Sequence, residues 1–131
     1  MKCVVTGGAG FIGSHLVERL LKDGHTVTAL DNFSTGRPQN LAHLLPRPNL
    51  ELKQIDVNET ESAAPYFAGV DWVFHLAALA DIVPSIQHPL IYHHANVDGT
   101  VSVLECARRA GVKRFVYAAS SSCYGIPEEY P

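Results

Sequence analysis

The sequence is short of three things: long apolar runs, cysteines and basic segments. No apolar stretch approaches the roughly 20 residues that a membrane-spanning helix needs, and the apolar run after Lys2 is too short for a signal peptide. Three cysteines without a CxxC pair give neither a disulfide framework nor a zinc motif. The net charge of −3, with no basic run, gives no support for nucleic-acid binding. We therefore expect a cytoplasmic protein with neither a membrane nor a nucleic-acid partner.

The cysteines and histidines that are present do not form a metal-site pattern. His93 and His94 are the only close pair among the seven histidines, and adjacent helical positions point about 100° apart, which suits chelation poorly. Cys3 falls in an expected strand and Cys106 in an expected helix, and strand alternation turns Cys123 toward a core as well. We expect three buried, reduced thiols and no bound metal.

Apolar runs alternate with helical stripes along the chain, of which 47% is apolar. The expected strands are residues 2–6, 25–31, 51–57, 70–78 and 112–120. The expected helices are residues 11–23, 60–67 and 90–110, the first with its apolar stripe on Ile12, Leu16, Val17, Leu20 and Leu21. This alternation predicts an α/β fold: a Rossmann-type, doubly wound parallel sheet with right-handed connections, truncated after about five strands. We expect one domain over residues 1–131.

A glycine-rich stretch joins the first expected strand to the first expected helix. Gly8, Gly10 and Gly13 fit G-x-G-x-x-G, and Gly7, Gly10 and Gly13 fit G-x-x-G-x-x-G. Between a strand and a helix this pattern is typical of a pyrophosphate site, because bare backbone lets N–H groups approach the phosphates at the positive end of the helix. A glycine turn without a ligand is the alternative for the motif taken alone.

A carboxylate ends the second expected strand where a ribose would lie. Asp31 stands 18 residues after Gly13, close to the spacing of about 20 at which an acidic residue binds the ribose hydroxyls of NAD and disfavours the 2′-phosphate of NADP. Arg37, in the following loop, is the opposing observation because a guanidinium could hold that phosphate. Asp56 and residues 75–78 end the next two strands at the same edge, although Asp56 alone also suits a helix N-terminus. The balance favours NAD.

Six ordered motifs along the chain resemble one family. They are TGGAGFIGSH at 6–15, Asp31-Asn32, Asp56-Val57, HLAA at 75–78, NVDGT at 96–100 and SSSCYG at 120–125. Together they resemble the extended short-chain dehydrogenase/reductase superfamily. Within it they are most similar to the NAD-dependent nucleotide-sugar epimerase/dehydratase branch, which includes UDP-glucose and UDP-N-acetylglucosamine 4-epimerases. The resemblance covers essentially the whole chain.

The resemblance implies a role for each matching residue. The NAD-binding residues would be Gly7, Gly10, Phe11, Ile12, Gly13, Asp31, Asn32, Ser34, Thr35, Gly36, Asp56, Val57, Leu76, Ala77, Ala78, Ala80 and Asn96. The sugar would be bound by Ser85, Ser120, Ser121 and Ser122, with Ser120 as the catalytic residue that hydrogen-bonds the hydroxyl being oxidised. The substrate would be a UDP-hexose, UDP-N-acetylhexosamine or UDP-uronate. Its C4 hydride would pass to NAD and return on the other face, which is 4-epimerisation.

One part of the family pattern is missing from the chain. The family's base is the tyrosine of a Tyr-x-x-x-Lys motif, and none of the tyrosines here has a lysine four positions later. We therefore expect these residues to be the N-terminal cofactor half of a longer epimerase, inactive alone because the Tyr, the Lys and a C-terminal substrate domain are absent. The alternative is a short, non-catalytic protein that senses NAD(H).

Two further implications concern the reaction and the assembly. Dehydratases of this branch usually place acidic residues after the catalytic threonine, whereas Ser121 and Ser122 stand here, which favours an epimerase over a 4,6-dehydratase. The helix expected at 90–110 would form part of a four-helix bundle in a homodimer of the longer protein.

Overall fold

The structure is a computed structural model that describes residues 1–126, apart from the side chains of Ser121 and Ser122. The strands are β1 (Lys2–Thr6), β2 (Thr26–Asp31), β3 (Leu50–Gln54), β4 (Trp72–His75) and β5 (Arg114–Tyr117). The α-helices are α1 (Phe11–Lys22), α2 (Thr60–Ala63), α3 (Ile82–Gln87), α4 (Pro89–His93) and α5 (Gly99–Ala110). Short turns of other types are η1 (Pro38–Leu41), η2 (Ala64–Phe67), η3 (His94–Asp98) and η4 (Ser121–Tyr124), of which η3 is π-helical and the rest are 3-10.

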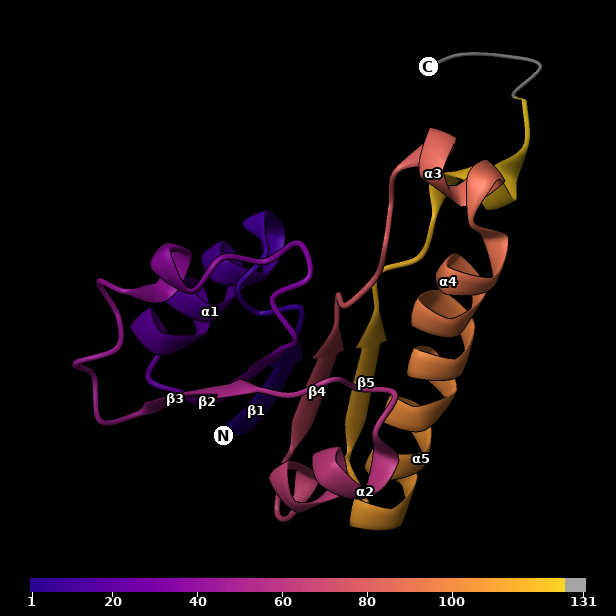
Figure 1. The fold of residues 1–131 in the computed structure, drawn as a ribbon. Helices are drawn as coiled ribbons and strands as arrows, with labels where there is room; N and C mark the ends of the chain where they lie inside the picture. Colours follow the sequence, from indigo (N-terminus) through magenta and orange to yellow (C-terminus); the bar gives the residue numbers. More distant parts are fainter. Residues whose placement is uncertain (127–131) are drawn as a thin grey trace.

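The strands form one parallel sheet in the order β3-β2-β1-β4-β5. The chain moves outward from β1 to β3, crosses back to the other side of β1, and moves outward again to β5. Strand order therefore reverses between β1 and β4, and open α/β sheets bind ligands at the carboxyl ends of the strands at such a point. Figure 1 shows α1 on one side of the sheet and the column of α4 and α5 on the other. The expected Rossmann-type parallel sheet is confirmed.

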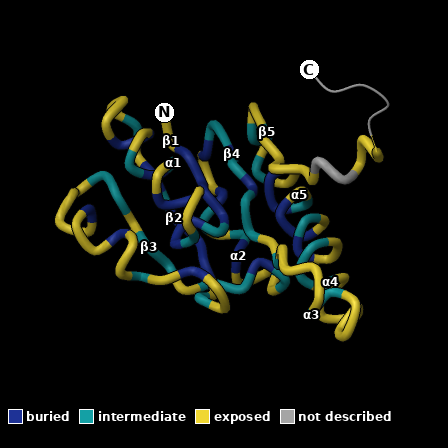
Figure 2. Tube along the Cα trace, turned by 90° about the horizontal axis from the view of Figure 1, so that it is seen from above, coloured by how far each residue is buried: buried dark blue, intermediate teal, exposed yellow. Residues whose placement is uncertain are grey.

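Alternation along β1 builds a core on each face of the sheet. Cys3 and Val5 pack with α1 and η1, whereas Val4 packs with η2 and α5. Phe67 is fully buried in this second core. Each large apolar side chain contributes about 1.5–3 kcal/mol when it is buried, so the two cores hold the strand ends in a common register. Figure 2 shows buried trace along β1 and largely exposed trace around α3 and α4.

Three strands, β3, β4 and β5, end earlier than their apolar patterns predict, and β5 ends at Tyr117 instead of residue 120. The last pair between β1 and β4 is Thr6 with His75, because the glycine turn begins directly after Thr6 and leaves nothing for β4 to pair with. In the same way β3 ends at Gln54, which pairs with Asp31 at the end of β2. The residues after each strand are thereby released as loops at the carboxyl edge of the sheet, where they line the site described below.

Three local expectations were wrong. Ile12 is 66% exposed instead of buried, because the first turn of α1 lies beyond the core that Val17 and Leu20 fill. Cys123 is exposed, since the chain leaves strand geometry at Tyr117 and enters η4, whereas the other two thiols are buried. Helix α3 was not expected. It has no buried residue, so its sequence carries no amphipathic stripe that would predict a helix.

The helix expected over 90–110 is a continuous column of α4, η3 and α5, which Gly111 ends in the left-handed conformation, with φ 67°. The π turn in its middle is a local widening of a kind that often occurs at functional sites. Nowhere in residues 1–126 is a helix both long and apolar enough to cross a bilayer.

Candidate functional site

Two hollows open at the carboxyl ends of the strands and share one wall. The first lies at the ends of β1, β2 and β3, and the expected cofactor residues that line it are Gly7, Asp31, Asn32, Ser34, Thr35, Asp56, Val57, Leu76, Ala77 and Ala78. The second lies at the ends of β4 and β5, and the expected residues that line it are Leu76, Ala77, Ala78, Ala80, Ser85, Asn96 and Ser120. Residues 76–79 line both hollows. The hollows therefore form one groove across the point where strand order reverses.

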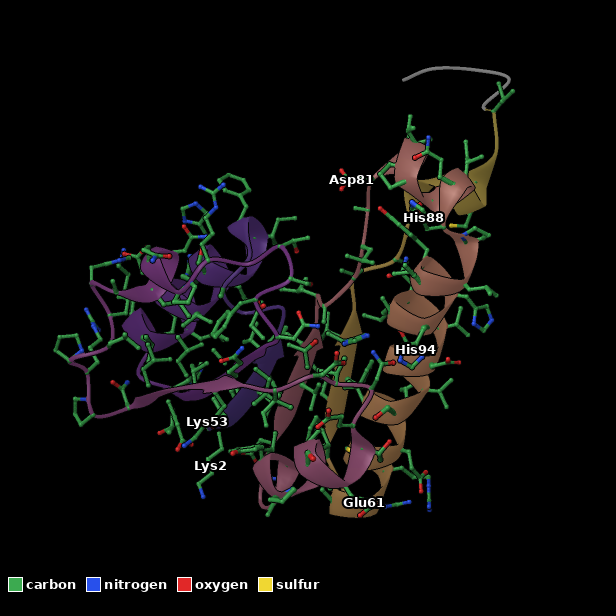
Figure 3. All side chains as sticks on the ribbon, viewed as in Figure 1. Lys2, Lys53, Glu61, Asp81, His88 and His94 are labelled. Carbon is green, nitrogen blue, oxygen red and sulfur yellow. The ribbon has the colours of Figure 1, made fainter. Side chains whose placement is uncertain are left out.

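The remaining expected residues lie beside the groove and line neither hollow. Gly10, Phe11, Ile12 and Gly13 form the turn into α1, and Gly36 lies against the carboxylate of Asp31. The side chains of Ser121 and Ser122 are outside the described residues. Sequence reasoning missed other lining residues, among them Leu30, Ile55, Asn58, Leu79 and Ala95 in the first hollow and Asp81, Ile82, Tyr92, Thr100, Tyr117, Ala118 and Ala119 in the second. Figure 3 shows Asp81 and His88 at the end of the molecule where β4 and β5 finish.

The glycine stretch makes a turn that no larger residue could form. Gly7 has a φ of +67°, and a Cβ on it would lie 2.8 Å from the backbone nitrogen of Ala77. A Cβ on Gly13 would overlap the carbonyl oxygen of Gly7, so α1 starts directly against the turn. Helix α1 has no side-chain cap at its start, which leaves the N–H groups of its first turn open toward an anion.

Asp31 is fixed at the end of β2 by the glycine turn and by its own loop. One carboxylate oxygen accepts a hydrogen bond from the backbone N–H of Ala9 at 2.9 Å, and the other accepts one from Phe33 at 2.8 Å. Gly36 closes over this carboxylate, since a Cβ there would lie 2.6 Å from Oδ2. Each carboxylate oxygen keeps further acceptor capacity, and the residue lines the first hollow. A pair of hydroxyls in that hollow would meet a carboxylate already held in place.

Asp56, which follows the neighbouring strand β3, also lines the first hollow and belongs to a small amide network. Its Oδ2 accepts a hydrogen bond from Asn32 Nδ2 at 3.1 Å, and its Oδ1 accepts two from Asn58, one backbone and one side-chain, both at 2.9 Å. Burial acts to raise the pKa of Asp56, but the hydrogen bonds from Asn58 and Asn32 outweigh it and hold the pKa below its usual value. Asn58 Oδ1 is buried and, within the described residues, lacks a hydrogen-bond partner. That oxygen faces Gly99 of α5, where a built Cβ would lie 3.4 Å from it, so the group presented to the hollow is the ionised carboxylate of Asp56.

His75, the last residue of β4, is a buried and neutral histidine under the groove. It is 1% exposed, and its two ring nitrogens lie 2.6 Å from Thr6 Oγ1 and 3.0 Å from Thr100 Oγ1. Burial lowers its pKa to about 4. The ring of Tyr117 stacks on it at 5.9 Å between centroids. The imidazole therefore joins β1, β4 and α5 without carrying a charge.

The depressed pKa of His75 predicts a stability loss in mild acid. The unfolded chain takes up this proton near pH 6.5, whereas the folded chain takes it up only near pH 4, so lowering the pH through this window favours unfolding. We expect His75 to account for a loss of about 3 kcal/mol in the free energy of unfolding. Denaturant titrations at several pH values give the free energy of unfolding of wild type and of His75→Leu as a function of pH. The difference between the two slopes measures the contribution of His75, because the contributions of the exposed histidines are the same in both proteins. Equal slopes would contradict the assignment.

The parallel sheet, the glycine turn into α1 and the acidic end of β2 define a Rossmann-type domain. Comparison with known families agrees with this class. The chain belongs to the NAD dependent epimerase/dehydratase family, which matches residues 3–131.

Named relatives of the chain carry out several nucleotide-sugar reactions. It is 44% identical, over its whole length, to UDP-glucuronic acid decarboxylase 1 of Arabidopsis thaliana, of which it covers 29%. The structure of UDP-N-acetylglucosamine 4-epimerase from Methanobrevibacter ruminantium M1, in complex with UDP-N-acetylmuramic acid, matches 99% of this chain and 41% of its own, with 36% identity and a TM-score of 0.89. UDP-glucose-4-epimerase from Stenotrophomonas maltophila, with bound NAD and formylated UDP-arabinopyranose, matches all of this chain and 40% of its own, with 30% identity and a TM-score of 0.92.

The chain spans less than a third of the length of the curated relatives that it matches. What these relatives bind and transform as whole proteins is therefore carried over below as a proposal.

Proposed function

We propose that the chain forms the NAD-binding part of a UDP-sugar 4-epimerase. The observation that carries this proposal is the groove that runs from Asp31, past residues 76–79, to Ser120 across the reversal in strand order. Its length and its two chemically different ends suit a dinucleotide whose nicotinamide meets a sugar. Two of the similar solved structures are UDP-sugar 4-epimerases.

The residues present fit NAD. The first hollow offers the fixed carboxylate of Asp31 to a ribose diol, and the carboxylate of Asp56 offers an acceptor to an adenine amino group. The start of α1 offers N–H groups to the pyrophosphate, with Gly7 and Gly13 keeping the turn free of side chains. We assign the adenosine half to the first hollow and the nicotinamide to the second, along residues 76–79.

The second hollow provides the sugar-binding groups of this part of the protein. Ser120 follows β5 and lines the hollow opposite residues 76–79, and Ser85 lines it from α3. We assign to Ser120 the hydrogen bond that orients the C4 hydroxyl for oxidation, and to Ser85 a contact with the rest of the sugar. Bound NAD supplies the acceptor for the C4 hydride. Small side chains at Ala77 and Ala78 leave room for a ring to lie against backbone.

Decarboxylation of a UDP-uronate is a second candidate, favoured by the 44% identity to UDP-glucuronic acid decarboxylase 1. Oxidation of a uronic acid at C4 gives a β-keto acid, and such acids lose carbon dioxide readily. Both reactions therefore begin with the same C4 oxidation, and they differ in what happens to the 4-keto sugar. A 4,6-dehydratase would also begin this way but needs acid–base groups for the elimination of water, and serines stand in the two positions after Ser120.

Product analysis separates these functions. The protein made from its natural gene is incubated with NAD and, in turn, UDP-glucose, UDP-N-acetylglucosamine and UDP-glucuronate, and the sugars are identified by proton NMR. We expect one substrate to reach equilibrium with its C4 epimer, with all its carbons retained. A UDP-pentose with release of carbon dioxide would establish the decarboxylase, and a 4-keto-6-deoxy sugar would establish the dehydratase. Tight NAD binding without turnover would favour an NAD(H) sensor.

We also propose that the column of α4, η3 and α5 forms a homodimer interface. Val97, Val101 and Leu104 follow one another at i, i+4 and i+7 across the junction of η3 and α5 and are 45–60% exposed, and Leu90, before the π turn, is 83% exposed. Such an apolar stripe is typical of a helix that packs against another helix.

Replacing Leu104 with glutamate would place a charge in this interface. We expect Leu104→Glu to halve the molar mass measured by light scattering, because a buried unpaired charge costs several kcal/mol. Leu45→Glu is the control, since Leu45 is equally exposed, at 46%, but lies after η1 on the other face of the sheet. A wild-type protein that is already a monomer would reject the interface.

A further inference from the structure

A series of buried and part-buried hydrogen bonds runs along the floor of the second hollow and holds both ends of the wall that the two hollows share, residues 76–79. We propose that His75 is the positioning residue of this series: it links Thr6 to Thr100 and so sets the geometry of residues 76–79, along which the cofactor lies. The proposal rests on the proposed NAD site. It assigns to His75, which lines the second hollow, and to Thr6, which lines neither, a joint role in cofactor affinity. We call the hydrogen-bond series from Thr6 through His75 and Thr100 to Asn96 the relay.

The direction of every bond in the relay follows from its chemistry. The backbone N–H groups of Leu76 and Ala77 donate to Thr6 Oγ1, at 3.2 and 3.3 Å, and the N–H of Leu76 is shared with the backbone oxygen of Thr6 at 3.1 Å. With its oxygen accepting from both, the Thr6 hydroxyl donates its proton to His75 Nδ1, 2.6 Å away. The neutral imidazole must then carry its proton on Nε2, which donates to Thr100 Oγ1 at 3.0 Å.

The relay continues into the π turn and reaches the other end of the wall. The hydroxyl of Thr100 donates to the backbone oxygen of Asn96 at 2.6 Å. The side chain of Asn96 then clamps Leu79 in both directions, since its Oδ1 accepts from the backbone N–H at 2.8 Å and its Nδ2 donates to the backbone oxygen at 2.9 Å. The anchors of residues 76–79 are thus Thr6 at the start and Asn96 at the end. His75 and Thr100 couple them.

Two features make this wall sensitive to its anchors. The backbone of Leu76 and Ala77 lies against Gly7 so closely that a Cβ on the glycine would come within 3 Å of it. A shift of residues 76–79 would therefore displace the glycine turn and also change the shape of the second hollow. Thr6 is 0% and His75 1% exposed, so water cannot replace the bond between them once it is lost.

Thr6→Val tests the proposal because valine keeps the shape of threonine and removes only the hydroxyl. We expect the dissociation constant of NAD, measured by calorimetry on the protein from its natural gene, to rise about tenfold or more. Thr6→Ser retains the hydroxyl, and we expect it to restore the constant to within about twofold of wild type. An unchanged constant in Thr6→Val would overturn the proposal.

Thr60→Val is the matched control for a merely structural effect. Thr60 bonds Ser102 of the same helix α5 through a hydroxyl pair at 2.8 Å, away from the wall. We expect it to lower the melting temperature without changing NAD affinity. If Thr60→Val loses NAD affinity in the same proportion to its fall in melting temperature as Thr6→Val does, both losses reflect reduced stability of the fold. That result would overturn the positioning role. If Thr6→Val does not fold, Thr100→Val breaks the same relay one step further on.

Hydrogen exchange separates failure of this inference from failure of the proposed function. Should the wild type bind no NAD, the proposed function fails, while the relay still predicts slow exchange at the amides of Leu76, Ala77 and Leu79. In Thr6→Val the N–H of Leu76 keeps the backbone oxygen of Thr6 as its acceptor, so the informative amides are those of Ala77 and Leu79. We expect these two amides to exchange at least about tenfold faster in Thr6→Val and at the wild-type rate in Thr60→Val. Equal protection in all three proteins would refute the relay irrespective of any cofactor.

Discussion

Replacing Gly13 with alanine is expected to abolish tight NAD binding and to destabilise the fold by about 3 kcal/mol. The added Cβ would overlap the carbonyl oxygen of Gly7 and lie 2.9 Å from the Cα of Gly8. These are backbone atoms held between β1 and α1, so they cannot move aside as a flexible side chain could. Helix α1 must tilt away from the turn, which misaligns its N–H groups with the pyrophosphate. Calorimetric titration with NAD and a denaturant titration measure the two effects.

Gly24→Ala is the matched control for this substitution. Gly24 has a φ of +82° and nothing within 4 Å of a built Cβ, so alanine there costs only the left-handed backbone conformation, about 1 kcal/mol. Because Gly24 follows α1 at the amino-terminal edge of the sheet, NAD affinity should stay at the wild-type value. Retention of wild-type affinity in Gly13→Ala would contradict the placement of the pyrophosphate.

Asp31→Ala is expected to weaken NAD binding about 100-fold, because the ribose diol loses its charged acceptor. The loop that Asp31 orders through Ala9 and Phe33 loosens as well, and loosening alone would weaken NAD and NADP together. The ratio of the two affinities therefore isolates the carboxylate. We expect NADP binding to be weak in the wild type and to change little or improve in the variant, since the repulsion of the 2′-phosphate is gone.

Two further variants complete this test. Arg37→Ala should leave the preference for NAD intact, because Arg37 is exposed and its backbone N–H, bonded to Ala9, remains. Glu51→Gln removes an exposed carboxylate on β3, paired with Lys53, and should change neither affinity. A wild type that binds NADP as tightly as NAD would show that Arg37, and not Asp31, decides the choice.

The fold was predictable because it rests on local patterns. Short apolar strands alternate with amphipathic helices, and the crossovers that join parallel strands are almost always right-handed. The parallel sheet and the reversal of strand order beside β1 therefore follow from the order of the elements. The glycine motif and Asp31 were recognisable because their spacing is set by that same unit. Expectations failed where no periodic pattern exists: α3 has no buried face, Ile12 lies past the core, and Cys123 follows the end of a strand.

The relay beneath the groove could not be predicted in the same way. Thr6 and His75 are 69 positions apart, and their contact depends on the register that pairs them as the last residues of β1 and β4. Thr100 joins them only because the π turn and α5 place its hydroxyl over the imidazole. The motifs HLAA and NVDGT were visible in the sequence, but the bonds between them belong to the packing of α5 on the sheet.

A crystal structure of the protein from its natural gene with bound NAD tests the central claim most directly. The account predicts the ribose hydroxyls of the adenosine within hydrogen-bond distance of Asp31, the pyrophosphate at the start of α1, and the nicotinamide between residues 76–79 and Ser120. Adenosine bound away from the first hollow, or a nicotinamide that does not reach Ser120, would contradict it.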